Sequence, residues 1–334
     1  MDDVIVVGGG PVGLFAATLL RLHGFSVRLV ESLPVLGGQA AVLYPDKAVY
    51  DVAGFPEVSG RDLAEALVRQ ASGYAPEVVL GAEAVAIEGD PRSGFAVATA
   101  AGTFRGRVVL LTIGIGAFTP RRLAAEGAAE LEGRRIHYLL PPADAVRGRR
   151  VVVVGGGDTA VDWVLALAPL AREVVLVHRR TAFRAQGEML RRAKALGPVR
   201  VVTPYEVRRI AERPDGALAV TLEGRQGAEP LEVAADVVVG GLGYQADPGP
   251  ARHWDVGVEG AVIPVDPATM ETRRTGIYAA GDVAAYPGKV RLLATGFGEV
   301  GIAAAAIRRR LRPETSAHLP HSTSVRGRPA PVDA

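Results

Sequence analysis

Short, nearly uninterrupted runs of valine, isoleucine and leucine alternate with stretches of helical periodicity along most of this chain. Such runs are typical of parallel strands, which are buried on both faces and covered by the intervening helices. In the N-terminal part, DVIVVGGG, SVRLVE and RVVLLTIG predict strands, and residues 12–23 and 61–71 predict helices. This order of elements predicts an α/β protein built on a Rossmann-like parallel sheet with helices on both faces.

The same alternation is repeated in residues 117–238, after a hinge predicted at 114–120 by its glycine and proline residues. The strand patterns of this second part are VVVVGGG, EVVLVHRR, VRVVTP, ALAVTLEG and AADVVVG. Shorter alternating segments in the first part, VVLGAEAVAIE and GFAVATA, predict antiparallel ribbons beside the parallel sheet. The chain therefore contains two Rossmann-like patterns.

A late apolar strand, TGIYAAGDV, and a helix predicted over 298–310 follow the second part. We expect them to complete the first domain, so that the second domain is inserted into it. The expected division is residues 1–116 with 239–311 for the first domain, 117–238 for the second, and 312–334 for a tail. Proline, serine, threonine and arginine are frequent in the tail, and this composition alone predicts disorder.

Two glycine-rich turns lie at equivalent places in the two patterns, each between a buried strand and a helix. The first has G-x-G-x-x-G spacing at Gly8, Gly10 and Gly13, and the second has G-x-G-x-x-A spacing at Gly155, Gly157 and Ala160. The glycines allow a tight turn, close approach of a pyrophosphate and close packing of the helix, whose free N–H groups face the phosphates. One such turn is weak evidence. Two of them indicate a chain that binds two dinucleotides and passes electrons between them.

The residues that end the next strand distinguish the two turns. After the first turn this position is Glu31, whose carboxylate can accept hydrogen bonds from ribose hydroxyls. After the second turn it carries Arg179 and Arg180, with Arg184 close behind, and guanidinium groups bind a ribose 2'-phosphate that a carboxylate would repel. We therefore expect FAD at the first turn and NADPH at the second. The alternative is that these arginines form a solvated charge cluster.

Composition limits the possible partners. Hydrophobic residues make up 49% of the 334 residues and charged residues 22%, which is typical of globular proteins. The net charge of +2 gives no support for nucleic-acid binding, although a pI near 9.0 is compatible with an acidic protein partner. No apolar run reaches the ~18 residues of a membrane span, and no signal peptide is evident, so we expect a cytoplasmic protein without a membrane anchor.

The chain contains no cysteine. It therefore cannot relay electrons through a Cys-x-x-Cys disulfide or hold a cysteine-ligated cluster, and no metal site is expected. Electrons that leave a flavin in this protein must pass to an external acceptor.

Eight runs between Met1 and Ser324 match the motifs of one known family. They are GGGPVG, ESLPVLGGQ, LYPDKAVYDVAGFP, TIGIGAFTPRRL, GGGDTAVDW, HRRTAFRA, AAGDVAAYPGKVRLLATGFGE and LPHSTS, and the most specific parts are YDVAGFP and HSTS. In these runs the chain resembles the thioredoxin-reductase-like ferredoxin–NADP⁺ reductases, a family of bacterial and archaeal FAD enzymes. The segment HYLLPPADAVRGRR, where thioredoxin reductase itself has its dithiol, has no sulfur, which is consistent with the ferredoxin branch.

This resemblance implies the residues that bind the two nucleotides. The implied FAD ligands are Gly8, Gly10, Pro11, Gly13, Glu31, Gln39, Tyr44, Tyr50, Phe118, Asp282 and Thr323, with the backbone of Ala84 and Val85 at the adenine. The implied NADPH ligands are Gly155, Gly157, Asp158, Thr159, His178, Arg179, Arg180 and Arg184. For Asp158 a second interpretation is that it only caps the first turn of its helix.

The resemblance also assigns the two faces of the flavin. Tyr50 matches the aromatic residue that stacks on one face, and His321 matches the residue that covers the other, in the partner subunit of a homodimer. The alternatives are that Tyr50 is a core aromatic and that His321 is solvated in a proline-rich tail.

The implied activity is electron transfer between NADPH and ferredoxin or flavodoxin through FAD, without a redox disulfide. Flavin supplies the chemistry of such a reaction, so no general acid or base is assigned. Two alternatives remain open at this point. One is an NADPH-dependent reductase of quinones or other small acceptors, and the other is a non-catalytic nucleotide-binding sensor.

Overall fold

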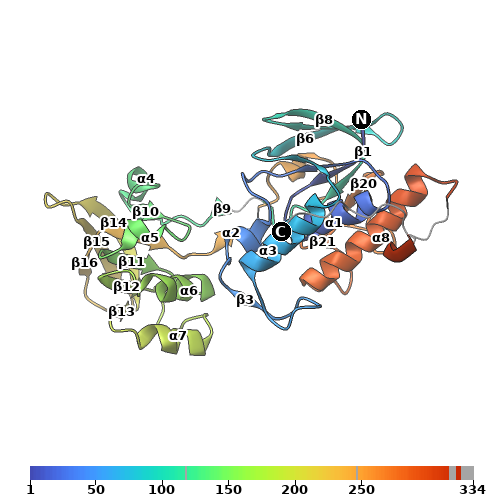
Figure 1. The fold of residues 1–334 in the computed structure, drawn as a ribbon. Helices are drawn as coiled ribbons and strands as arrows, with labels where there is room; N and C mark the ends of the chain where they lie inside the picture. The colour runs from blue at the N-terminus through green and yellow to red at the C-terminus, as the bar shows by residue number, and fades with distance from the viewer. Residues whose placement is uncertain (117–118, 246, 316–320, 325–334) are drawn as a thin grey trace. The chain divides into compact units, whose positions relative to one another are not determined.

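The computed structural model of the chain describes residues 1–116, 119–245, 247–315 and 321–324 (Figure 1). The chain divides into two compact units, and the second is inserted into the first. Unit 1 comprises Met1–Ala117 and Ala246–Ala334, and unit 2 comprises Phe118–Gln245.

The chain returns to unit 1 at residue 246 rather than at the expected 239. Strand β17 (Val237–Gly240) pairs inside the sheet of unit 2, and β18 (Tyr244–Gln245) pairs with β9 (Thr119–Pro120). These antiparallel strands close unit 2 where the chain enters and leaves it. Their two-residue length gave no periodic pattern from which the sequence could predict them.

Unit 1 is built on a seven-stranded sheet in the order β5-β2-β1-β8-β7-β6, with β20 pairing in parallel with β8. Its parallel part contains the expected buried runs, and its antiparallel part contains the expected ribbon. The ribbon prediction is wrong for the start of VVLGAEAVAIE, because β5 pairs in parallel with β2 at the edge of the sheet. The strands are β1 (Asp2–Val7), β2 (Val27–Val30), β5 (Glu77–Val79), β6 (Ala84–Asp90), β7 (Gly94–Thr99), β8 (Gly102–Leu111) and β20 (Ile277–Ala279). The late strand predicted to return to the first domain therefore does so.

Three helices of unit 1 pack side by side, with α1 (Pro11–Leu22) in contact with both α3 (Gly60–Ser72) and α8 (Leu293–Leu311) (Figure 1). Proline occupies the first turn of α1, where its missing N–H costs nothing, and Ser59 caps α3 by accepting from the N–H of Asp62 at 3.0 Å. Helix α8 begins before the expected residue 298, because Gly296 serves packing rather than termination. A Cβ on Gly296 would lie 2.6 Å from the Val12 side chain of α1.

Unit 2 contains a parallel sheet in the order β10-β17-β11-β12-β13 and a separate antiparallel sheet, β14-β15-β16. Successive valines of β11 point to opposite faces, as strand geometry requires. Val151 and Val153 pack with helices α6 and α7, and Val152 and Val154 pack with the antiparallel sheet. The parallel sheet thus lies between a helical layer and a β layer. The elements are β10 (Ile136–His137), β11 (Arg150–Val154), α6 (Asp158–Leu167), β12 (Glu173–Val177), α7 (Gly187–Lys194), β13 (Val199–Val202), β14 (Tyr205–Glu212), β15 (Leu218–Gly224) and β16 (Leu231–Ala235).

Short elements complete the two units. In unit 1 they are α2 (Gly38–Val42), β3 (Ala48–Val49), β4 (Val58–Ser59), η1 (Gly249–His253), β19 (Ile263–Pro264), β21 (Ala284–Ala285) and η2 (Ser322–Ser324), and in unit 2 they are α4 (Ala128–Leu131) and α5 (Ala143–Val146). The α/β fold class predicted from the sequence is confirmed. Within the described ranges, no helix is both long enough and apolar enough to cross a membrane.

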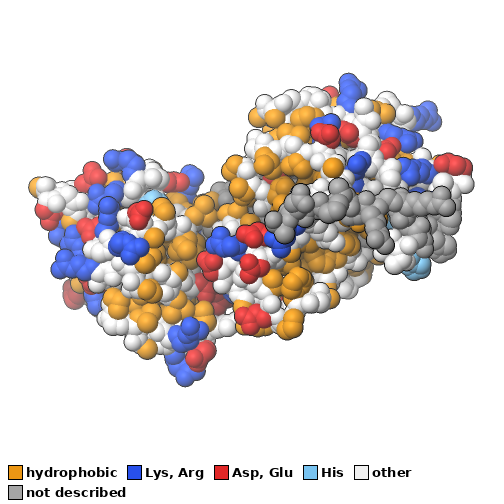
Figure 2. Space-filling view, in the orientation of Figure 1, with side chains coloured by type: hydrophobic (Ala, Val, Ile, Leu, Met, Phe, Trp, Pro, Cys, Tyr) orange, Lys and Arg blue, Asp and Glu red, His pale blue; other side chains and the backbone are white. Residues whose placement is uncertain are grey.

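Side chains of both charges are interspersed on the visible face of the protein (Figure 2). At the antiparallel sheet of unit 2, the guanidinium groups of Arg208, Arg213 and Arg225 each pair with a glutamate of another strand. Such exposed pairs contribute little to stability, but they neutralise much of the positive charge that the arginine-rich sequence implies.

Candidate functional site

The first glycine turn connects β1 to α1 in unit 1. Gly8 adopts a left-handed φ of +105°, and its N–H donates to Val30 of the neighbouring strand at 2.8 Å. Gly13 lies so close to the turn that a Cβ would be 1.8 Å from the carbonyl oxygen of Gly8. At Gly10 the space is open, and the nearest atom to a Cβ would be 3.8 Å away. Pro11 then begins α1, and the helix N-terminus faces the open side of the turn.

The Glu31 carboxylate is only 6% exposed and is bound on both oxygens. Oε2 accepts from the N–H of Gly9 at 2.6 Å, and Oε1 accepts from the N–H of Leu33 at 2.8 Å. Thr112 fixes the opposite side of the turn, because its hydroxyl donates to the carbonyl of Gly8 at 2.8 Å. Glu31, assigned to ribose, therefore also holds the glycine turn in place. No motif in the sequence points to Thr112, whose role depends on the fold.

Gln39 and Tyr44 lie in and just after helix α2, and Asp282 comes from the late turn of unit 1. Gln39 is half-buried and lies near Gly114. Burial raises the pKa of the Tyr44 phenol above its ordinary value, and the negative charges of Asp282 and Asp51 raise it further. Asp282 is therefore near enough for its charge to act on Tyr44, although the two are far apart in the sequence.

The two residues assigned to the adenine lie at the start of β6. Ala84 is buried, whereas the side chain of Val85 is 50% exposed. The register of β6 with β7 shifts between Ala84 and Ala86, and the carbonyl of Val85 accepts from the indole N–H of Trp254 at 3.3 Å. The backbone at Val85 is therefore interrupted by a bulge and leaves the regular ladder.

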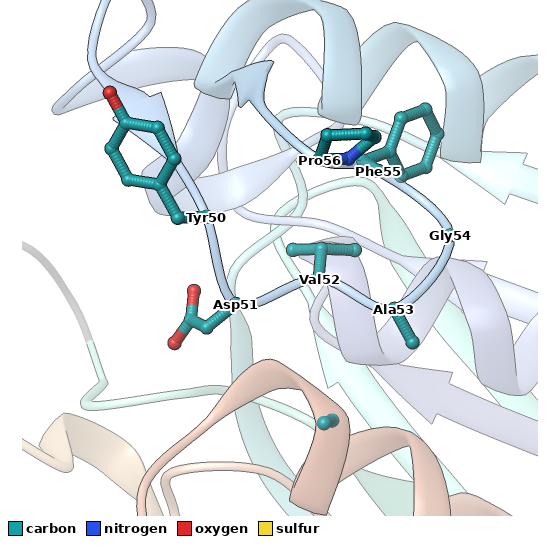
Figure 3. A pocket seen from close by; sticks show the side chains of 8 residues that line it. Tyr50, Asp51, Val52, Ala53, Gly54, Phe55 and Pro56 are labelled. Carbon is teal, nitrogen blue, oxygen red and sulfur yellow. The ribbon is translucent and has the colours of Figure 1, made fainter.

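A hollow in unit 1 is formed by the YDVAGFP segment and the start of α8 (Figure 3). It is lined by Tyr50, Asp51, Val52, Ala53, Gly54, Phe55, Pro56 and Ala294. Tyr50 is 68% exposed, so its interpretation as a core aromatic is wrong. An exposed aromatic ring beside an open hollow is the arrangement that stacking on a planar ligand needs.

Two further residues assigned to the flavin belong to the tail. His321 and Thr323 are exposed, at and just before helix η2, and neither lines the hollow. Phe118 lies outside the described residues, as does most of the tail.

A buried polar group next to Asp282 was not foreseen from the sequence. Glu299 of α8 is 2% exposed, and its Oε2 accepts from the N–H of Gly281 at 2.7 Å. Its Oε1 accepts from the Tyr286 hydroxyl at 2.6 Å and pairs with the Lys289 ammonium. Burial and the bond to Glu299 raise the pKa of Tyr286 to about 12. The signal in the sequence is a single carboxylate in the alanine-rich part of α8 that precedes its C-terminal arginines.

The second glycine turn connects β11 to α6 in unit 2. The last residue of its G-x-G-x-x-A motif is Ala160. The Ala160 methyl group fits because the residues that face it, Gly155 and Gly241, have no side chains. A Cβ on Gly155 would lie 2.7 Å from the Ala160 methyl carbon, and a Cβ on Gly241 would lie 2.8 Å from it. Gly157 has open space around it, and Thr159 is half-buried in the first turn of α6. The second turn therefore also presents an accessible backbone at a helix N-terminus.

The loop between β12 and α7 carries the arginines expected to select NADPH. Arg179, Arg180 and Arg184 are all exposed. Among the residues that the structure describes, none of the three forms an ion pair with a carboxylate, in contrast to the arginines of the antiparallel sheet. Their guanidinium groups are therefore available to an anionic ligand.

His178, also assigned to NADPH, lies against the second glycine turn. Its ring packs over Gly156, where a Cβ would come within 2.2 Å of it, and it stacks on Phe183 with ring centroids 4.8 Å apart. Burial lowers the pKa of His178, the hydrogen bond with the Ala182 carbonyl partly opposes this, and the positive charges of the neighbouring arginines lower it further. Neutral at pH 7, this imidazole supports the glycine turn rather than adding positive charge to the site.

The interpretation of Asp158 as a helix cap is wrong. The cap residue of α6 is Gly157, and no side chain caps this helix. Asp158 instead accepts from the backbone N–H of Gln186 at 3.0 Å, across the arginine loop.

Residues 2–308 match the family described as pyridine nucleotide-disulphide oxidoreductase. A protein named "Ferredoxin--NADP reductase 2" from Shouchella clausii is 43% identical over 97% of this chain and 98% of its own length. "Ferredoxin--NADP reductase" from Saccharopolyspora erythraea is 46% identical over 97% of both chains. The thioredoxin reductase structure from Lactococcus lactis superimposes with a TM-score of 0.75 over 93% of this chain and 99% of its own, at 23% identity, which establishes a common fold.

Proposed function

This chain belongs to the pyridine nucleotide-disulphide oxidoreductase family, and we propose that it is a ferredoxin–NADP⁺ reductase that transfers electrons between NADPH and ferredoxin through FAD. One observation carries the proposal. Two glycine turns, the first held by a buried carboxylate and the second beside free arginines, occur in a chain without cysteine. Relatives of nearly full length carry the name of this activity.

The residues of unit 1 fit FAD. The open space at Gly10 would accept the pyrophosphate at the N-terminus of α1, while Glu31 and Asp282 would bind the ribose and the ribityl–pyrophosphate region. The hollow beside Tyr50 would receive the isoalloxazine ring, with the phenol stacked on one face. In unit 2, Arg179, Arg180 and Arg184 would bind the 2'-phosphate of NADPH.

When bound, FAD supplies two-electron exchange with NADPH and one-electron exchange with a carrier. The side chains of this protein bind and orient the two nucleotides, and neither hydride nor single-electron transfer requires a protein acid or base. The glycine turns fix the phosphates, and Tyr50 fixes the plane of the ring. With no cysteine to store electrons, the acceptor must be external.

The decisive experiment is a comparison of acceptors. We expect the purified protein to be yellow and to release one FAD per chain on denaturation. With NADPH as donor, kcat/KM should be larger for ferredoxin or flavodoxin than for quinones. Release of FMN or no flavin would refute the FAD assignment. A larger kcat/KM with quinones would identify the small-acceptor reductase instead, and a colourless protein would support the nucleotide sensor.

Coenzyme preference tests the arginine loop. Changing both Arg179 and Arg180 to alanine removes two exposed guanidinium groups from the expected 2'-phosphate site. Because each charge-assisted hydrogen bond contributes about 1.5–3 kcal/mol, KM for NADPH should rise by at least ten-fold or so. KM for NADH, which lacks this phosphate, should stay nearly constant in steady-state assays. Equal losses for both coenzymes would mean that the arginines are structural.

We further propose that the protein acts as a cytoplasmic homodimer in which His321 and Thr323 of one tail reach the flavin of the partner subunit. Their exposure in the single chain is consistent with a role outside it.

Truncation after Thr315 tests the tail. The shortened chain keeps Arg312, which donates to the carbonyls of His23 and Gly24 and stacks on Phe25, so unit 1 should remain intact. We expect FAD to remain bound through the other contacts, while its absorption spectrum and the rate of hydride transfer change as one face opens to solvent. An unchanged spectrum and rate in stopped-flow experiments would show that the tail is only a solvated terminus.

A further inference from the structure

The arginine loop and the second glycine turn are fastened to each other by three hydrogen bonds. The carbonyl of Gly156 accepts from the backbone N–H groups of Arg184 at 2.8 Å and of Ala185 at 3.2 Å. The Asp158 Oδ1 atom accepts from the N–H of Gln186 at 3.0 Å. Two of these bonds join backbone to backbone, so a side chain is needed only for the third. Asp158 is therefore the residue whose identity decides whether the third hydrogen bond forms.

The arginine loop is also held by the packing of its apolar side chains. Ala185 is buried in the core formed with α6 and α7, and the rings of Phe183 and His178 stack beneath the glycine turn. The carboxylate of Asp158 secures the C-terminal end of the loop, where α7 begins, so the loop is held at both ends with Arg184 between the anchors.

A carboxylate at this position is costly for nucleotide binding. Asp158 is the first residue of α6, next to the turn that would bind a pyrophosphate, and two like charges at short distance repel each other. The positive end of the α6 dipole favours a carboxylate in the first turn, but this does not require Asp158 to accept from Gln186. The bond across the loop is the interaction that is specific to this site.

We propose that Asp158 is a positioning residue for coenzyme selection: it holds the arginine loop in register with the glycine turn, so that the guanidinium of Arg184 lies at the correct distance for a 2'-phosphate when the pyrophosphate is bound. The inference rests on the proposed binding of NADPH at this turn. The distance between the glycine turn and the arginine loop then depends on one hydrogen bond, and loss of that bond weakens the discrimination between NADPH and NADH.

Two substitutions at this position separate the hydrogen bond from the charge. Asp158→Asn removes the charge and keeps the Oδ1 acceptor, whereas Asp158→Ala removes both. Both coenzymes contain the pyrophosphate, so the lost repulsion changes both affinities alike and cancels in the ratio of Kd for NAD⁺ to Kd for NADP⁺. This ratio is measured by isothermal titration of the purified holoprotein and does not depend on turnover.

We expect Asp158→Asn to retain the wild-type ratio. In Asp158→Ala the ratio should fall by about five-fold, which corresponds to ~1 kcal/mol, the usual contribution of one hydrogen bond. Hydrogen exchange of the segment 179–190 should become faster in the alanine variant only. Equal ratios in the two variants would overturn the proposal. A wild-type protein with no preference for NADP⁺ would instead refute the coenzyme assignment, and the inference with it.

A variant of the donor residue, Gln186, tests whether the effect of Asp158→Ala comes from the lost hydrogen bond or from another change at Asp158. Gln186 has a φ of −55°, within the range that proline adopts, so Gln186→Pro removes the N–H donor at a compatible backbone angle. It should reproduce the loss of selectivity of Asp158→Ala. A wild-type ratio in Gln186→Pro would also overturn the proposal.

Discussion

Replacing Gly13 by alanine should both abolish FAD binding and destabilise the protein. The added methyl group would lie 1.8 Å from the carbonyl oxygen of Gly8 and 2.7 Å from the hydroxyl of Thr112, which itself bonds that carbonyl. Neither atom can move freely, since one is backbone and the other is hydrogen-bonded. Overpacking of this severity costs about 3 kcal/mol or more, and the Tm should fall by roughly 10 °C in a thermal melt.

Gly10→Ala is the matched control in the same turn. Its φ of −73° suits any residue, and the nearest atom to the new Cβ is 3.8 Å away. We therefore expect the FAD-free protein to melt as the wild type does, while Kd for FAD rises by at least about ten-fold because the methyl group occupies the approach of the pyrophosphate. If Gly10→Ala lowered the stability as much as Gly13→Ala, the structure would require glycine at both positions, and the loss of FAD binding could not be assigned to the pyrophosphate. If it bound FAD normally, the pyrophosphate would have to lie elsewhere.

Glu299→Ala should be the most destabilising single change in α8. It leaves the Lys289 ammonium, 8% exposed, without its carboxylate, and it leaves the Gly281 N–H and the Tyr286 hydroxyl without their acceptor. Removing one member of a buried pair typically costs about 3–5 kcal/mol, which denaturant titration at neutral pH would measure. FAD affinity should fall as well, since Asp282 directly follows the released Gly281.

The double variant Lys289→Met with Glu299→Gln tests whether the unpaired charge causes this loss. It removes both charges, while the glutamine oxygen can still accept from Gly281. We expect it to recover most of the stability lost in Glu299→Ala, because replacing both members of a buried pair is often nearly neutral. Equal destabilisation of the two variants would mean that the geometry of the network, rather than the buried ammonium, limits stability.

Local patterns in the sequence identified most of the parallel strands, helices α1 and α3, and both glycine turns, but not the short parallel strands β5 and β10. They do so because a buried strand needs a continuous apolar run, and because a dinucleotide turn needs glycine wherever a side chain would collide. The late strand Ile277–Ala279 could also be assigned to the first sheet, since it resembles the other buried strands and precedes the Gly281–Asp282 turn. The start of α8 could not be located from the sequence, because glycine usually weakens a helix. Only the structure shows that Gly296 lies inside the helix, where its close approach to Val12 leaves no room for a side chain.

The sequence alone thus determined the fold class, the insertion of one nucleotide-binding unit into another, the absence of a redox disulfide, and the contrast between Glu31 and the arginine loop. All of these depend on residue type and on spacing along the chain. Only the tertiary structure decided what the individual polar atoms bond to: that Glu31 holds Gly9, that Glu299 holds Gly281, that His178 supports Gly156, and that Asp158 bonds Gln186 rather than capping its own helix. The partners of a buried or bridging side chain come from segments distant in the sequence, and their approach is set by packing, which leaves no periodic pattern along the chain.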